Sequence, residues 1–143
     1  MKKLIRVSCV AMVCILMAIS IVPAQASPLP TQIYTYNGIT NGDNKMVVVC
    51  TLIADPTGPS ASTYMYACSA TFVTSIAVAL TGLYYNASTE TNVPESNSAS
   101  NHQSLNVSTS ISGHTYSTFK SDHALTSPKN CYGTFSTSIL GDP

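Results

Sequence analysis

The feature that most constrains the fold is a strict alternation of side chains along several short segments of the chain. Successive side chains of a β-strand point to opposite faces of a sheet, so residues two apart share a face and one face is built to be covered. The clearest alternating sets are Tyr64, Tyr66, Cys68, Ala70 and Phe72, then Ile76, Val78 and Leu80. This pattern predicts strands.

Further short segments carry strand signals, with turn residues between them. They are residues 32–36, 46–53, 104–112, 114–120, 122–126 and 131–140. Asn37-Gly38, Asn41-Gly42 and the stretch 55–60 are turn signals. Six to eight short strands without a helical stripe predict an all-β fold, a small antiparallel β-sandwich or barrel-like domain.

A helix or a membrane span is the alternative for residues 67–83, because this stretch is uncharged and contains several alanines. It holds 17 residues, whereas a spanning helix needs about 20. A helix would also scatter the alternating set around its axis, so the strand interpretation is favoured.

The first 26 residues have the organisation of an export signal. A basic start, Met1 to Arg6, precedes an apolar run from Val7 to Val22, and Pro23 is followed by Ala24-Gln25-Ala26. This pattern predicts a cleaved N-terminal signal helix, residues 1–26, and a secreted, extracellular mature chain. A retained anchor is disfavoured by the short run, and neither Cys9 nor Cys14 has the setting of a lipoprotein cysteine. The lysine-led start indicates a bacterial source.

The mature portion, residues 27–143, has the length of a single domain. Its basic side chains are Lys45, Lys120 and Lys129 against six acidic ones, which gives a net charge of −3. Nucleic-acid binding needs clustered Lys and Arg to displace counterions from phosphates, so nucleic acid is not expected as a partner. No stable membrane span is expected after signal cleavage.

The segment at about 86–102 is rich in Asn, Ser, Thr and Glu and has little to bury. Such composition predicts a disordered polar loop within the mature domain.

Three cysteines follow the signal: Cys50, Cys68 and Cys131. Outside the cytosol a disulfide can persist, and a hairpin centred near Gly58-Pro59 would place Cys50 almost opposite Cys68. The 50–68 pair is therefore the preferred disulfide, with three buried, unpaired thiols as the alternative. Nothing near any of the three predicts a reactive thiol.

The other chemical candidates lack the required geometry. Ser121-Asp122-His123 cannot form a relay, because neighbours in an extended chain point in opposite directions. Glu90 and Glu95 lie in the predicted loop, and glycoside chemistry needs a rigid carboxylate pair. The three histidines and the turn 41–44 lack the spacing of zinc or calcium sites. We therefore expect no enzyme, no metal and no cofactor.

The tyrosines provide the strongest binding signal. Tyr34 and Tyr36 are two apart, as are Tyr64 and Tyr66, so each pair shares one face of its strand. Tyrosine joins a packing ring to a hydroxyl that stays hydrated, which suits contact with a sugar or a protein. Packing at the margin of the core is the alternative.

These observations favour a secreted, non-enzymatic β-sandwich protein that acts by extracellular surface contact, as an adhesion, envelope-associated or interaction module. Its partner would be a surface glycan or protein that the sequence does not identify. The alternative is a secreted bacteriocin- or toxin-like antagonistic factor acting on a target cell envelope, which the small size, the low charge and the uncharged stretch 67–83 would suit. A secreted hydrolase is the third and least supported class.

Overall fold

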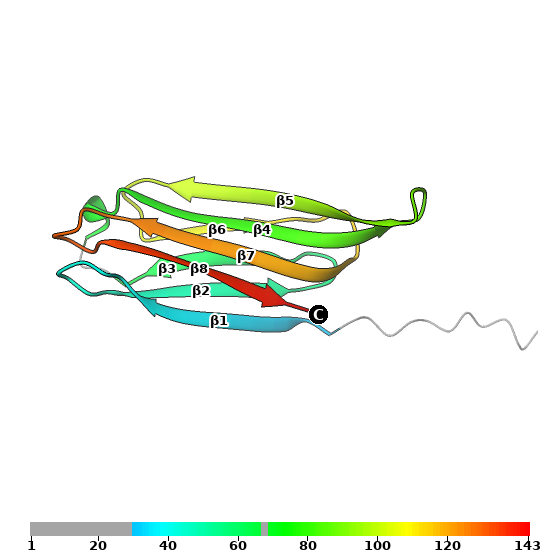
Figure 1. Cartoon of the computed structure of the whole chain (residues 1–143), viewed down its shortest axis with the longest axis horizontal. Helices are drawn as coiled ribbons and strands as arrows, with labels where there is room; N and C mark the ends of the chain where they lie inside the picture. The colour runs from blue at the N-terminus through cyan, green and yellow to red at the C-terminus, as the bar shows by residue number, and fades with distance from the viewer. Residues whose placement is uncertain (1–29, 67–68) are drawn as a thin grey trace, which may run out of the picture.

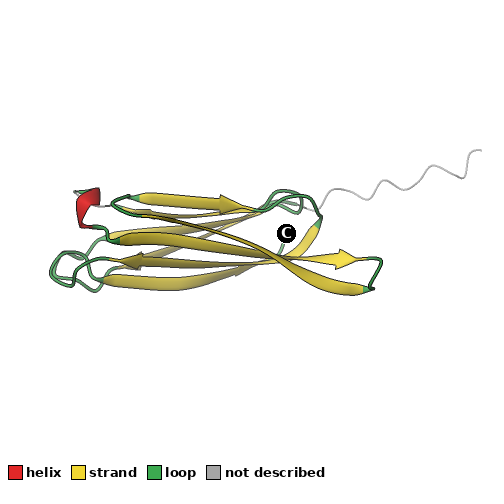
Figure 2. Ribbon diagram, turned by 90° about the horizontal axis from the view of Figure 1, so that it is seen from above, coloured by secondary structure: helices red, strands yellow, loops and turns green. Residues whose placement is uncertain are grey.

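The alternating segments form two antiparallel sheets of four strands that lie face to face (Figures 1 and 2). A computed structural model of the chain describes residues 30–66 and 69–143. Sheet A has the order β1-β2-β3-β6, and sheet B has the order β5-β4-β7-β8. The all-β prediction is therefore confirmed, with a sandwich of two sheets.

Most strands lie on the predicted segments, with four differences. Residues 91–101 form an additional strand, and the predicted segments 114–120 and 122–126 form one continuous strand. The alternating set that was predicted to run to Phe72 ends as a strand at Met65, and Asn37-Gly38 lies within a strand and not in a turn. Sheet A consists of β1 (Gln32–Ile39), β2 (Val47–Ala54), β3 (Ser60–Met65) and β6 (Asn106–Ser110). Sheet B consists of β4 (Ser75–Asn86), β5 (Thr91–Asn101), β7 (Tyr116–Thr126) and β8 (Thr134–Gly141). A 3-10 turn, η1 (Ala70–Phe72), precedes β4.

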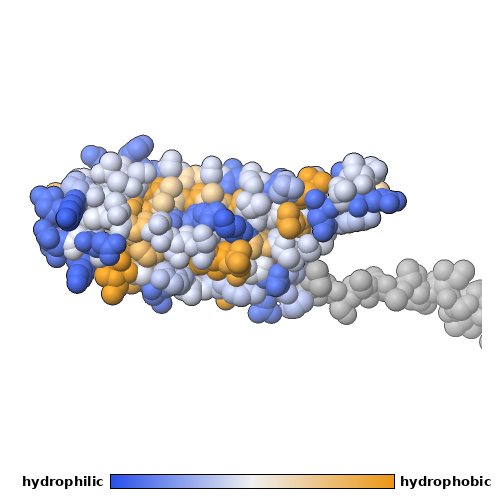
Figure 3. All heavy atoms as spheres, in the orientation of Figure 1, coloured by the Kyte–Doolittle hydropathy of each residue, from blue (hydrophilic) through white to orange (hydrophobic). Residues whose placement is uncertain are grey.

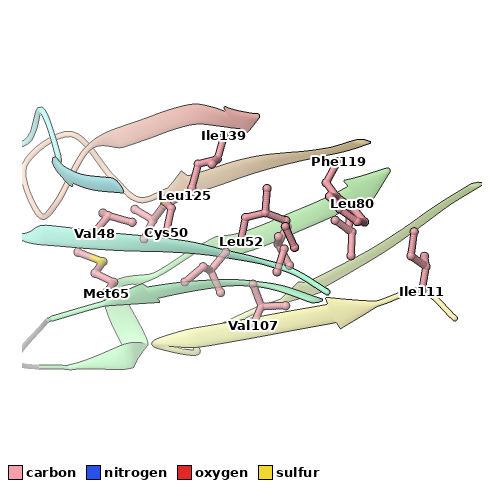
Figure 4. Close-up of a cluster of buried hydrophobic side chains, with 14 of the residues drawn as sticks. Val48, Cys50, Leu52, Met65, Leu80, Val107, Ile111, Phe119, Leu125 and Ile139 are labelled. Atoms are coloured by element: carbon pink, nitrogen blue, oxygen red, sulfur yellow. The ribbon is translucent and has the colours of Figure 1, made fainter. Parts of the chain in front are cut away.

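The core lies between the sheets and is built from the inward-facing half of each strand (Figure 4). Along β2 and β4, every second residue is almost fully buried and its neighbours are more exposed. The inward residues of these two strands include Val48, Cys50, Leu52, Ile76, Val78 and Leu80. Burial of each large aliphatic side chain stabilises the fold by about 1.5–3 kcal/mol, so this alternation is the main source of stability.

The turn between β2 and β3 sets a register different from the predicted one. A carboxylate oxygen of Asp55 accepts hydrogen bonds from the backbone N–H groups of Thr57 and Gly58, at 2.9 and 3.3 Å. This Asx-type turn closes the hairpin earlier than a turn at Gly58-Pro59 would. Cys50 therefore lies opposite Thr63, so the register predicted from a turn centred near Gly58-Pro59 is wrong.

The predicted loop at 86–102 is also wrong for residues 91–101, which form β5. This strand pairs with β4 without interruption from Thr91 to Asn101. It is an edge strand, so it needs few apolar residues: Val93 and Ala99 are half-buried, while most of its polar side chains remain exposed. Backbone hydrogen bonds to β4 hold this strand in place, because its side chains bury little apolar surface.

A polar chain crosses the middle of the core and joins the two sheets. Ser121 Oγ lies 2.8 Å from His123 Nε2, and His123 Nδ1 lies 2.8 Å from Thr63 Oγ1. Thr63 donates its hydroxyl proton to the carbonyl of Ala77 at 3.1 Å. Because that proton is used, the imidazole donates from Nδ1 to Thr63 and accepts at Nε2 from Ser121. Each buried polar side-chain atom of Ser121, His123 and Thr63 thus has a hydrogen-bond partner.

The predicted signal, residues 1–26, lies outside the described residues, as do Ala67 and Cys68. In the part of the chain that is described, no helix has the length and apolar character needed to cross a bilayer.

Acid should destabilise the protein through His123. Burial lowers the pKa of this imidazole from 6.5 to about 4, and Asp122 offsets the effect only in part. Between about pH 6.5 and pH 4 the unfolded chain binds a proton that the folded chain does not, so the free energy of unfolding falls as the pH falls. The full difference is about 3 kcal/mol, measurable by urea unfolding at stepped pH.

His123→Gln should lower the overall stability and flatten this pH dependence, because the titrating group is gone. His102→Gln, which replaces an exposed histidine, should keep the wild-type slope. An unchanged slope in His123→Gln would assign the acid sensitivity to the carboxylates instead.

A close backbone contact joins the 40–46 loop to the 127–133 loop at one end of the sandwich. Gly42 donates its N–H to the carbonyl of Tyr132 at 2.8 Å. A Cβ on Gly42 would lie 2.5 Å from the backbone nitrogen of Gly133, which cannot move aside as a side chain can. We expect Gly42→Ala to destabilise the fold by about 1–3 kcal/mol, measured by thermal or urea unfolding. Gly58→Ala is the matched control, since nothing lies within 4 Å of its Cβ position; equal losses would refute the argument.

Candidate binding surface

An apolar patch lies on the outer face of sheet A. Ile39 lies opposite Val47, and Val49 lies opposite Tyr64. Tyr66 continues β3 beside Val47, to whose carbonyl it donates its N–H at 3.0 Å. We call these five residues, Ile39, Val47, Val49, Tyr64 and Tyr66, the outer-face patch.

The exposure of the outer-face patch is high for side chains of this kind. Ile39 is 61% exposed and Tyr66 is 58% exposed, and Val47 and Tyr64 are also exposed. The rings of Tyr64 and Tyr66 meet edge to face with centroids 4.9 Å apart, so each ring helps to hold the other. Scattered exposed apolar residues need no explanation, but a contiguous set on one face is typical of a contact surface.

Strand parity accounts for the location of the patch. Thr63 and Met65 point into the core, so Tyr64 and Tyr66 point outward. Spacing in the sequence predicts the two tyrosines as surface residues, whereas the three aliphatic residues of the patch were not predicted. The Asn41-Gly42 turn is the sequence feature that could have predicted them, because the two strands that flank this turn bring Ile39 and Val47 opposite each other.

Tyr34 and Tyr36 lie on the opposite face of sheet A from Tyr64 and Tyr66. They are opposite Leu52 and Cys50, so they point toward sheet B at its edge. The Tyr34 hydroxyl donates to the carbonyl of Asp142 at 2.9 Å and accepts from the N–H of that residue at 3.2 Å. The ring of Tyr36 lies 6.2 Å from that of Phe135. These two tyrosines close the gap between β1 and β8 and do not share a surface with the patch.

The outer face of sheet B offers a different surface. A shallow hollow of about 520 Å³ lies there, lined mainly by the small side chains Ala77, Ala79, Ser98, Ser100, Ala124, Ser136 and Ser138. Its carboxylate, Asp122, is already engaged by Ser138 and by Lys120, whose Nζ is 2.9 Å away. In Figure 3, hydrophobic residues interrupt the middle of the visible face, and hydrophilic ones gather at its left end. The hollow offers hydroxyls and methyls, and the ring of His123, which belongs to its lining, is buried and cannot stack on a ligand.

The Ser121-Asp122-His123 sequence is divided between the two faces of sheet B. Ser121 and His123 are buried inside, whereas Asp122 points outward. Partial burial alone would raise the pKa of Asp122, but hydrogen bonds from Ser138 and Lys120 outweigh it and hold that pKa below its usual value. The three residues therefore do not form a relay.

Two further candidate residues, Glu95 and His114, contact aromatic side chains of the sandwich. Glu95 accepts a hydrogen bond from the hydroxyl of Tyr116 at 2.7 Å; burial, reinforced by this carboxylate, raises the pKa of Tyr116 to about 12. The ring of His114 stacks on Tyr84 with centroids 3.7 Å apart. Within residues 30–66 and 69–143, no cluster of three or more His, Cys, Asp or Glu side chains could hold a metal ion.

Comparison of the chain with protein-family models, curated proteins and solved structures finds no match.

Cys50 is buried on the inner face of β2, and burial raises the pKa of its thiol to about 12. Its predicted disulfide partner, Cys68, lies outside the described residues, so the 50–68 pair stays a prediction. Cys131 is only half-buried.

These environments predict unequal thiol reactivity in the folded, reduced protein. The thiolate is the reactive form, so Cys50 should react with iodoacetamide at least about a hundredfold more slowly than Cys131. Peptide mass spectrometry of timed samples measures both rates. In urea the two rates should converge; equal rates in the folded protein would contradict the burial of Cys50.

Proposed function

We propose that the protein is a secreted, non-enzymatic β-sandwich that acts by surface contact outside the cell, with the outer-face patch as its contact surface. The patch is the observation that carries this proposal. It combines two mutually packed tyrosine rings with three aliphatic side chains on a rigid sheet, and none of its members is charged. The partner is a surface glycan or a surface protein.

The chemistry of the patch supports contact rather than catalysis. Tyrosine rings stack on the apolar faces of sugars or pack against a protein, while their hydroxyls bond to polar groups of the partner. Binding energy at such surfaces concentrates in a few aromatic residues. A sheet holds these rings in place before binding, which reduces the entropy lost on association.

One of the features that favoured the antagonistic-factor alternative is buried in the fold. Small size and low charge still suit that alternative, but its third motive was the uncharged stretch 67–83, and residues 75–83 lie within β4 in the interior of sheet B. Ile76, Val78 and Leu80 are buried between the sheets, so an intact sandwich does not offer them to a membrane.

The test is binding of labelled mature protein to intact bacterial cells and to purified cell-wall glycan. The double substitution Tyr64→Ala and Tyr66→Ala should weaken binding at least about tenfold, or 1.4 kcal/mol. Protease treatment of the cells should abolish binding if the partner is a protein, and treatment with a glycan hydrolase should abolish it if the partner is a glycan.

Tyr85→Ala is the matched control. Tyr85 is 62% exposed but lies on the other sheet, in β4, so its loss should leave binding unchanged. Equal losses in both variants, or full binding by the double variant, would refute the role of the outer-face patch.

A further inference from the structure

Four strands of the described sandwich have a neighbour on one side only: β1 and β6 in sheet A, and β5 and β8 in sheet B. The backbone of an edge strand presents N–H and C=O groups that can pair with another chain. Proteins guard such edges with short strands, charges, prolines, bulges or covering side chains. The four edges of this protein are guarded to different degrees.

Two of the edges are guarded. Strand β6 is only five residues long, and side-chain amides of Asn97 and Asn101 donate to the carbonyls of Ser110 and Asn106, at 2.9 and 3.0 Å. Strand β5 carries Pro94 in its interior, beside the charged Glu95.

Strand β1 has none of these guards. Its eight residues include no charge and no proline, and its register with β2 runs without a shift from Gln32 to Ile39. In Figure 1 it is the outermost strand of its sheet, and among the described residues no strand pairs with its outer edge.

The hydrogen-bond ladder identifies which backbone groups of β1 are free. Thr40 donates its N–H to the carbonyl of Met46 at 3.0 Å, and this pair continues the β1–β2 register by one step. Hydrogen-bonded and non-hydrogen-bonded pairs alternate along an antiparallel ladder, so the even-numbered residues of β1 bond to β2. The N–H and C=O groups of the odd-numbered residues therefore face the open edge: Ile33, Thr35, Asn37 and Ile39.

We propose that β1 pairs with β1 of a second copy of this chain, antiparallel about a two-fold axis at Tyr36. In this register Ile33 lies opposite Ile39 of the second copy, and Thr35 lies opposite Asn37 of the second copy. All four odd-numbered residues then exchange hydrogen bonds with odd-numbered residues, as the ladder requires.

The side chains favour a second copy over other occupants. Ile33 and Ile39 are 67% and 61% exposed and lie three positions on either side of Tyr36, so self-pairing brings isoleucine against isoleucine on both sides of the axis. Such β-branched pairs stabilise sheets. Because β1 contains no charged residue, self-pairing brings no like charges together. Strand β8 is also uncharged, but its outward residues are Thr134, Ser136, Ser138 and a single apolar residue, Leu140.

Self-pairing would join the two copies of sheet A into one continuous sheet. Both outer-face patches would then lie on the same side, available to one large partner. The pairing does not depend on the proposed contact function, and it is tested with the protein alone, so the failure of either proposal leaves the other standing.

Amide hydrogen exchange of the mature chain, followed by NMR at low and high protein concentration, tests the pairing directly. The amides of Tyr34 and Tyr36 should be protected at both concentrations, because they bond to β2. The amides of Thr35 and Asn37 should exchange at least about tenfold more slowly at the concentration where sedimentation velocity shows a dimer.

Two substitutions at one residue test the same edge. Thr35→Pro removes an N–H that faces the open edge, a place where proline is tolerated, and Thr35→Lys places two like charges beside the axis. Each should raise the dimer dissociation constant at least about tenfold. Ser136→Lys, an exposed position on β8, is the matched control and should dimerise like the wild type.

A wild-type chain that stays monomeric at every concentration would overturn the proposal. So would a dimer in which the Thr35 and Asn37 amides gain no protection, or one that Ser136→Lys weakens as much as Thr35→Lys does. Circular dichroism of each variant shows whether it is folded; if a Thr35 variant is unfolded, the exchange rates of the wild type decide.

Discussion

The two-residue repeat of the antiparallel strand is the constraint on which the rest of this structure depends. In β2 it sends Val48 and Leu52 into the core and Val47 and Val49 to the outer face. The same repeat governs the backbone, because alternate residues of an antiparallel pair bond to alternate sides. The core, the outer-face patch and the free edge are thus three consequences of one two-residue repeat, and a slip of one residue would exchange the inward and outward sets.

The polar chain through His123 adds specificity that apolar packing alone does not supply. Thr63 belongs to sheet A, whereas His123 and Ser121 belong to sheet B. Another stacking of the two sheets would leave Thr63 Oγ1 and His123 Nδ1 without each other, and a buried unpaired polar group costs about 1–3 kcal/mol. The hydrogen bonds of His123 therefore disfavour alternative arrangements of the two sheets. The same buried imidazole makes the stability of the protein sensitive to acid.

The sequence was sufficient to predict the strands that bury one face and was misleading where burial is absent. Ile76, Val78 and Leu80 identify β4 by alternation alone. Strand β5 gives no such signal, because its order comes from pairing with β4 rather than from its own apolar residues. The β2–β3 register depends on the side chain of Asp55, whose hydrogen bonds select the turn, and composition does not encode that choice.

The candidate site could be predicted only in part for a related reason. Spacing shows that Tyr64 and Tyr66 share a face, and likewise Tyr34 and Tyr36, but it does not show which face is inside. The face depends on the neighbour across the sheet, because directly opposite residues share a face. Tyr64 lies opposite Val49 on the outer face, and Tyr34 lies opposite the buried Leu52 on the inner face. The result is an asymmetric sandwich. Sheet A displays a contiguous set of uncharged aliphatic and aromatic side chains, whereas sheet B displays mainly hydroxyls, methyls and the Lys120–Asp122 ion pair, with Tyr85 and Leu140 as its exposed large apolar residues. Contact by apolar complementarity therefore favours sheet A.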